Sequence, residues 1–177
     1  MPDETDVKQL LIEMATAIET HTHSNSYDAP LMIGIKTGGA WVANHLHQQL
    51  EYKDPLGVLN IAFYRDDFST LGMHPEVSPS QLPVDVNDRH IILVDDVLYT
   101  GRTIRAAMNE IFDYGRPASI TLVVLVDRSN TRELPIQADI IGKTITLNKG
   151  EHVKLLGPEP LMLSVDNIRS TGTQKTG

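Results

Sequence analysis

The stretch Ile91–Thr103, IILVDDVLYTGRT, runs from four apolar residues into two adjacent acids and then into a glycine turn rich in hydroxyls. An apolar run without polar alternation is typical of a strand that is covered on both faces. In parallel α/β sheets, ligands bind beyond the carboxyl ends of the strands, which is where Asp95 and Asp96 fall. Two adjacent ionised carboxylates repel each other, so we expect them to face a cation or hydroxyl donors. A sugar diol, with or without Mg²⁺, meets both requirements.

The turn Thr100–Thr103, TGRT, follows the acids at the start of a predicted helix. It supplies backbone N–H groups, two hydroxyls and a cation, where the helix dipole favours an anion. A monophosphate fits this cradle, and a diol-binding pair so near to it predicts a ribose 5-phosphate site. The simpler alternative is that the acids and Thr103 only cap the helix, although a cap requires one such residue.

Composition and charge limit the class of protein. The chain has 177 residues, 41% of them hydrophobic, which suits one domain over residues 1–177 with a frayed tail at 170–177. The net charge of -8 argues against a surface that attracts nucleic acid everywhere, but residues 89–154 carry 9 basic and 8 acidic side chains against 4 and 13 in residues 1–88. The sequence has no cysteine, no signal-peptide pattern and no apolar run long enough to cross a bilayer. We therefore expect a cytoplasmic protein.

Strands and helices alternate along the predicted chain. We expect helices at 6–20, 40–50 and 103–114, and strands at 31–35, 58–64, 90–94, 119–126 and 138–145. Residues 65–83 hold three prolines and no sustained period, which predicts a long loop of the kind that often forms a functional lid. The alternation indicates an α/β protein with a mostly parallel sheet.

These motifs resemble the phosphoribosyltransferases of the fold that binds 5-phosphoribosyl 1-diphosphate (PRPP). The segments GIKTGG, FYRDD, VDDVLYTGRTIRAAM, GRPASI, LVDR and RELPIQADIIGK are similar to the PyrR type, which pairs uracil phosphoribosyltransferase activity with RNA-binding control of pyrimidine operons. The resemblance implies the type I phosphoribosyltransferase fold: a mostly parallel twisted sheet flanked by helices, with a flexible loop and a small hood.

The resemblance also assigns roles to residues. It implies that Asp95 and Asp96 hold the ribose hydroxyls, that Tyr99, Thr100, Gly101, Arg102 and Thr103 hold the 5-phosphate, and that Lys36, Thr37, Gly38, Gly39 and Arg65 hold the pyrophosphate. Arg65, Asp95 and Asp96 are the catalytic candidates. The PyrR pattern has Arg where this chain has Gly38, which leaves pyrophosphate affinity and turnover open. Taken alone, the two glycines also fit plain turn chemistry, and Arg65 fits a solvated cluster with Asp66 and Asp67.

Val126, Asp127 and Arg128 lie at the carboxyl end of another predicted buried strand, and we expect them to line the base pocket or to meet the pyrophosphate; a structural ion pair is the alternative. The implied reaction converts uracil and PRPP to UMP and diphosphate. The resemblance implies that Mg²⁺ arrives bound to PRPP, and Asp95 and Asp96 are the only residues expected to contact this ion. Purine-using members of the family commonly carry Asp directly before the Thr-Gly turn. Tyr99 stands there in this chain and is a poor base at neutral pH, which favours a pyrimidine.

Two rival interpretations belong to other classes. The first is a UMP-responsive regulator that binds nucleotide and pyrimidine-operon leader RNA with little turnover, and any RNA face should then use later basic residues: Arg105, Arg116, Arg132, Lys143, Lys149 and Lys154. The second is a signalling receiver domain, which leaves TGRT unexplained. We expect a homo-oligomer without membrane partners.

Overall fold

The computed structural model describes residues 4–61 and 80–167, and side chains from Val7 onward. Three helices and seven strands make up this part of the chain. In chain order they are α1 (Glu4–Ser24), β1 (Leu31–Ile35), α2 (Gly38–Leu50), β2 (Gly57–Leu59), β3 (His90–Leu98), α3 (Arg102–Tyr114), β4 (Ser119–Arg128), β5 (Ile140–Ile145), β6 (Glu151–Leu156) and β7 (Met162–Asn167). The predicted frayed tail and most of the predicted long loop lie outside the described residues.

Strands β1 to β5 form one sheet in the order β2-β1-β3-β4-β5, and every pair is parallel. Leu93 at the middle of β3 pairs with Ile33 of β1 on one side and Leu122 of β4 on the other. The central strand is therefore enclosed by neighbours as well as by helices, which explains its unbroken apolar run. The predicted mostly parallel α/β sheet is confirmed.

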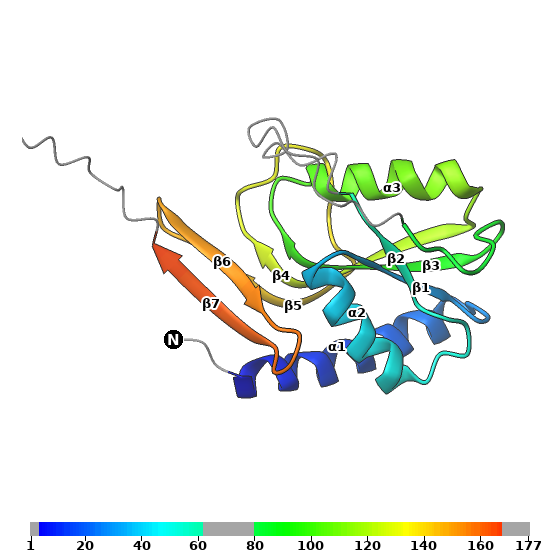
Figure 1. Cartoon of the computed structure of the whole chain (residues 1–177), viewed down its shortest axis with the longest axis horizontal. Helices are drawn as coiled ribbons and strands as arrows, with labels where there is room; N and C mark the ends of the chain where they lie inside the picture. The colour runs from blue at the N-terminus through cyan, green and yellow to red at the C-terminus, as the bar shows by residue number, and fades with distance from the viewer. Residues whose placement is uncertain (1–3, 62–79, 168–177) are drawn as a thin grey trace, which may run out of the picture.

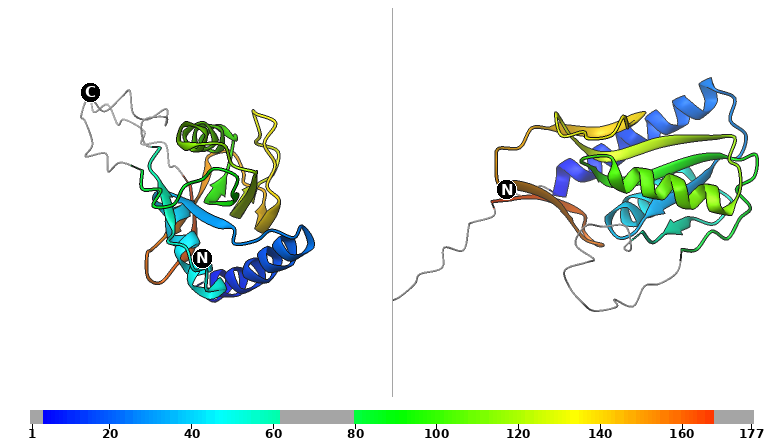
Figure 2. Two further views of the ribbon diagram at one scale, coloured as in Figure 1. Left: turned by 90° about the vertical axis from the view of Figure 1, so that its right-hand side faces the viewer. Right: turned by 90° about the horizontal axis from the view of Figure 1, so that it is seen from above.

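Helices cover both faces of this sheet. Figure 1 shows α1 and α2 below the sheet and α3 above it, and the end-on view in Figure 2 agrees. Successive residues of a strand point to opposite faces. Accordingly, Ile92 and Val94 belong to the core layer that faces α1 and α2, whereas Ile91 and Leu93 belong to the layer that faces α3.

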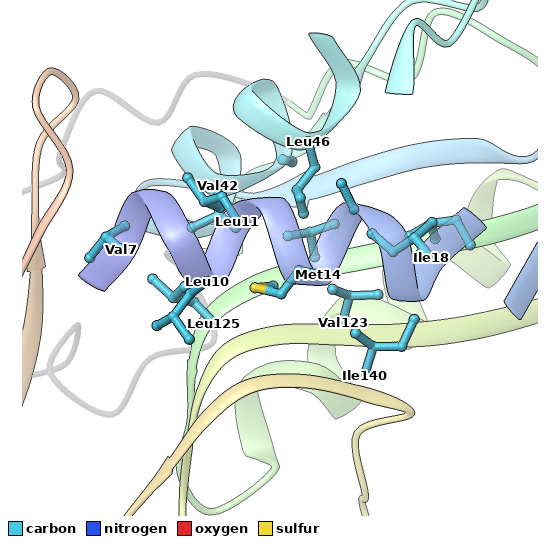
Figure 3. Packing of buried hydrophobic residues seen from close by; sticks show 14 of the residues in the cluster. Val7, Leu10, Leu11, Met14, Ile18, Val42, Leu46, Val123, Leu125 and Ile140 are labelled. Carbon is cyan, nitrogen blue, oxygen red and sulfur yellow. The ribbon is translucent and has the colours of Figure 1, made fainter. Parts of the chain in front are cut away.

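The lower core layer depends on an amphipathic α1. Val7, Met14 and Ile18 recur at helical spacing and are buried. Figure 3 shows that α1 lies between the α2 side chains and the sheet residues Val123 and Leu125. Burial of an aliphatic side chain of this size contributes roughly 1.5–3 kcal/mol, so this stripe accounts for much of the attachment of α1 to the sheet.

Several predicted boundaries differ from the structure. Helix α1 continues to Ser24 beyond its predicted end at Thr20, because Thr20 and Thr22 hydroxyls donate to helix carbonyls and His21 bonds to Thr121 of β4. Strand β2 covers only 57–59 of the predicted 58–64, and the part from residue 62 lies outside the described residues. Strand β3 passes through the two acids to Leu98, because Val97 and Leu98 still pair with β4.

A small antiparallel hairpin, β6 and β7, forms a second sheet after β5. Figure 1 shows it on the left, beside the start of α1. Leu155 and Leu161 of this hairpin region are buried in the lower core layer, next to the partly buried Trp41 of α2. The sequence predicted a small hood without assigning residues to it, and these two strands were not predicted.

Candidate functional site

The two acids lie near the carboxyl end of β3. Asp95 is 3% exposed, and Asp96 is partly exposed. An oxygen of Asp95 accepts the N–H of Asp96 at 2.9 Å, and Oδ1 of Asp96 accepts the N–H of Val97 at 2.9 Å. Hydrogen bonds from backbone N–H groups stabilise a charged carboxylate and fix its direction. One oxygen of each acid is thus bound to the strand, and Asp96 presents the more accessible carboxylate.

The start of α2 lies directly against these acids. Gly38 and Gly39 are the first residues of the helix, which begins two residues before the predicted Ala40. A Cβ atom on Gly38 would lie 2.2 Å from Oδ2 of Asp96, and one on Gly39 would lie 2.8 Å from the Val94 carbonyl oxygen and 2.9 Å from Asp95 Cα. At Gly39 the obstacle is the backbone of β3, so only glycine permits this approach, whereas at Gly38 a side chain would require the Asp96 carboxylate to turn aside. The two glycines therefore do more than turn the chain, since they bring a helix N-terminus onto the acid pair.

The helix N-terminus suits the predicted pyrophosphate site. The first N–H groups of a helix have no partner within it, and its dipole favours negative charge. Thr37 caps α2 without a side-chain hydrogen bond, and Lys36 and Thr37 are both exposed. The Lys36 N–H donates to the Leu59 carbonyl at 2.8 Å, which ties this loop to the end of β2.

The predicted phosphate turn begins α3. Gly101 caps the helix with φ +95°, a left-handed conformation that disfavours other residues, and a Cβ there would also lie 3.0 Å from Ile136. The N–H of Arg102 donates to the Thr100 hydroxyl at 3.2 Å. The helix starts at Arg102, one residue before the predicted Thr103.

The helix-capping alternative for the acids is wrong. The capping residue of α3 is Gly101, and no side chain caps this helix. The carboxylates of Asp95 and Asp96 instead accept N–H groups within β3. Their placement beside α2 thus does not arise from helix capping.

The end of β4 and the loop after it pack against the phosphate turn. Arg128 lies over the Tyr99 ring, 4.0 Å from its centroid, and Asp127 accepts a hydrogen bond from Arg132 at 2.6 Å. Asp127 thus forms an ion pair with Arg132. The Nε of Arg128 is buried without a hydrogen-bond partner among the described residues. Arg132 also donates to the Tyr99 carbonyl. This contact could not be predicted from the sequence, because periodicity carries no signal for a loop residue that bonds to a distant carbonyl.

Not every predicted residue can be placed. Arg65, Asp66 and Asp67 lie outside the described residues. Val58 and Gln81 exchange two backbone hydrogen bonds of 2.8 Å, and the N–H of Asn60 donates to the Ser80 hydroxyl at 3.0 Å. The described residues before 62 and after 79 thus lie side by side at β2.

The acid pair provides oxygen atoms that could bind a metal ion. Carboxylate oxygens suit Mg²⁺, and Asp95 and Asp96 provide two such groups beside a helix N-terminus. Within residues 4–61 and 80–167, no group of three or more acidic, histidine or cysteine side chains could hold a metal. The acid pair therefore fits part of the coordination shell of a Mg²⁺ ion.

Comparisons with known proteins agree with this geometry. Residues 5–156 match the family described as "Phosphoribosyl transferase domain". Solved structures similar in fold include hypoxanthine phosphoribosyltransferases from Trypanosoma cruzi, with a TM-score of 0.65 and 21% identity over 85% of this chain and 79% of that one, and from Staphylococcus aureus, with a TM-score of 0.64 and 19% identity over 82% and 76%. The fold and the site define a phosphoribosyltransferase.

Curated relatives narrow the family further. The chain is 58% identical to "Bifunctional protein PyrR" of Nitrosococcus oceani over 172 residues, which covers 96% of this chain and 97% of that protein. It is 53% identical over 155 residues to the protein of the same name from Pseudomonas aeruginosa, covering 88% and 91%. The chain belongs to the PyrR family of phosphoribosyltransferases. The predicted family and fold are confirmed.

Proposed function

We propose that this protein is a uracil phosphoribosyltransferase, which converts uracil and PRPP to UMP and diphosphate. The observation that carries this proposal is the meeting of three features: the acid pair of β3, the glycine start of α2 and the phosphate turn of α3. PRPP carries a diol, a pyrophosphate and a 5-phosphate, and these features supply a complementary partner for each. The names of the relatives support the same conclusion.

Each group acts mainly by positioning the substrate. Asp96, with Asp95 behind it, accepts hydrogen bonds from the ribose hydroxyls and places the anomeric carbon beside the α2 N-terminus. The amides at the start of α2, with Lys36 and Thr37, bind the leaving pyrophosphate. Thr100, Gly101 and Thr103 hold the 5-phosphate at the N-terminus of α3. Charge develops on the ring as the bond to pyrophosphate breaks, so a fixed carboxylate nearby lowers the barrier.

Mg²⁺ bound with PRPP neutralises charge on the pyrophosphate and so makes it a better leaving group. Asp95 and Asp96 are the residues that would contribute oxygens to it. We propose Arg65 as a further cation for the pyrophosphate, and Val126, Asp127 and Arg128 as neighbours of the base. The buried, unpartnered Nε of Arg128 is a donor that a carbonyl acceptor would satisfy.

A parallel assay tests the enzyme. Initial rates with PRPP and Mg²⁺ are compared for uracil, orotate, hypoxanthine and guanine. We expect uracil to be the preferred base, because Tyr99 lies beneath Arg128 and offers no carboxylate to exchange a proton with a purine ring. Faster turnover of hypoxanthine or guanine would overturn the base assignment, and no turnover of any base would overturn the catalytic role.

We also propose that the protein is a UMP-responsive regulator that binds pyrimidine-operon leader RNA. In this proposal it acts in the cytoplasm as a homo-oligomer, and residues 1–177 form one domain. The word "Bifunctional" in the relatives' names favours a second activity. Lys143, Lys149 and Lys154 are exposed on β5, on the following link and on β6. They are one set of candidate RNA contacts; Arg105, near the start of α3, and Arg116, two residues after its end, are another. No helix in the described ranges has the length and apolar content of a membrane span.

A titration with the leader RNA at about 0.1 M salt, with and without UMP, tests this role. Replacement of one phosphate-contacting lysine by Gln should lower the salt slope by about one unit and leave uracil turnover intact. A scrambled RNA is the control. Equal binding of both RNAs in both conditions would leave only the enzyme.

A further inference from the structure

The main chain of the phosphate turn is held from outside by residues 131–134. The Tyr99 carbonyl accepts a hydrogen bond from Nη1 of Arg132. The Thr131 hydroxyl, which has one proton to donate, lies 2.9 Å from the Tyr99 carbonyl and 2.8 Å from the Arg128 carbonyl. The Thr100 carbonyl accepts the N–H groups of Glu133 at 3.0 Å and Leu134 at 3.1 Å. Two successive peptide groups of the turn are thus held by Arg132, Glu133 and Leu134, none of which belongs to the turn.

This arrangement controls where the amides of the turn point. In a planar trans peptide the C=O and the following N–H point in opposite directions. A Tyr99 carbonyl directed at Arg132 therefore turns the Thr100 N–H away from Arg132. In the same way, the bonds to the Thr100 carbonyl direct the Gly101 N–H. These are two of the amides that the proposed function assigns to the 5-phosphate.

Arg132 is itself fixed to the sheet. Its Nη2 donates to Oδ1 of Asp127 at 2.6 Å, and the two side chains are 23% and 14% exposed. Asp127 ends the ladder between β4 and β3, where it pairs with Leu98 directly before the turn. The sequence predicted Arg132 as one of the residues that contact RNA. Because its guanidinium joins two protein groups, Arg132 is poorly placed for that role and is not among the candidate RNA contacts.

We propose that Arg132 is a positioning residue for the 5-phosphate of PRPP: it sets the orientation of the turn amides without contacting the substrate. The inference rests on the proposed function, because it takes Tyr99–Thr103 as the phosphate site. Thr131 has a smaller part, since its single hydroxyl proton is shared between the Tyr99 and Arg128 carbonyls.

The chain offers a matched control in Arg89. Its Nη2 also joins a backbone carbonyl, that of Ala29, to a carboxylate, that of Asp54, and its side chain is 23% exposed like that of Arg132. It precedes β3 at the amino end, away from the acids and the turn. Arg89→Gln thus reports the cost of breaking a similar bridge outside the site.

The experiment measures KM for PRPP, KM for uracil, kcat and thermal stability for Arg132→Gln, Arg132→Lys, Thr131→Val and Arg89→Gln. We expect Arg132→Gln to raise KM for PRPP by about tenfold or more, with KM for uracil changed less than about twofold. Arg132→Lys should recover part of the loss, and Thr131→Val should show a smaller change in the same direction. Arg89→Gln should lower stability without moving KM for PRPP.

Binding of ribose 5-phosphate by calorimetry separates the inference from the function on which it rests. Wild-type binding that Arg132→Gln retains in full would overturn the positioning role and leave the proposed function intact. Wild-type protein that binds neither ribose 5-phosphate nor PRPP would overturn both. If Arg132→Gln fails to fold, Arg132→Lys decides, and an unchanged KM for PRPP in that variant contradicts the proposal.

Discussion

Replacement of Gly38 by Ala places a methyl group against the more accessible acid. The new Cβ would lie 2.2 Å from Oδ2 and 2.7 Å from Cγ of Asp96, so the carboxylate has to rotate away. Its rotation breaks the 2.9 Å bond from the Val97 N–H to Oδ1 and moves the acceptor from the expected ribose position. The perturbation therefore acts on Asp96 through space, although the two residues are far apart in sequence.

The expected size follows from the lost contact. A hydrogen bond to a charged group contributes about 1.5–3 kcal/mol, so KM for PRPP should rise by about 10- to 150-fold. The free energy of unfolding should change by less than about 1 kcal/mol, because the displaced carboxylate is partly exposed and Ala favours a helix over Gly.

Gly39→Ala is the matched control. Its Cβ would meet backbone atoms of β3, the Val94 oxygen at 2.8 Å and Asp95 Cα at 2.9 Å, which cannot rotate out of the way. We expect this variant to lose about 1–3 kcal/mol of stability through overpacking. The two neighbouring glycines should thus separate an effect on substrate binding from an effect on the fold.

Initial-rate kinetics and urea denaturation measure both quantities for the two variants. A double-mutant cycle adds Asp96→Asn, and Gly38→Ala should add little to that change because both act through one carboxylate. The reasoning is refuted if Gly38→Ala leaves KM for PRPP unchanged, or if its effect adds in full to that of Asp96→Asn.

Three other outcomes follow from the structure. Asp95→Asn and Asp96→Asn should each weaken PRPP binding by about 1.5–3 kcal/mol in calorimetry, and unchanged affinity in both would exclude the diol site. Burial, with a smaller contribution from the charge of Glu19, raises the pKa of Tyr52 to about 12 from 10.0. The folded state thus holds the Tyr52 proton more tightly than the unfolded state does, so the contribution of Tyr52 to stability is complete below pH 10 and is lost as the pH rises to 12. Tyr52→Phe should lose less stability than the wild type over that range, and identical pH profiles of the two proteins would contradict the assignment. Ile18→Ala should cost about 2–5 kcal/mol in urea denaturation, since its side chain is 0% exposed in the layer beneath the sheet, and a loss under 1 kcal/mol would show that α1 contributes little.

Local patterns were enough to predict most of the elements. The apolar runs of β1, β3 and β4 are contiguous in sequence. Such a run predicts a strand covered on both faces without any knowledge of the neighbouring strands. The stop of α3 before Gly115 and Pro117 was predicted for the same reason, because both residues act on their own backbone. The hairpin of β6 and β7 was not assigned, since its exposed residues alternate too weakly to stand out.

By itself, the sequence determined the parallel α/β sheet, the acid pair at a strand end and the glycine turn after it, because each depends on residues within a few positions of one another. Tertiary structure alone decided which segments meet there. The strand order places β1 beside β3, and this brings Gly38 onto Asp96; the pairing of β3 with β4 brings Arg132 to the Tyr99 carbonyl. Such contacts depend on strand order and on the path of loops, and a periodic pattern of apolar residues contains neither.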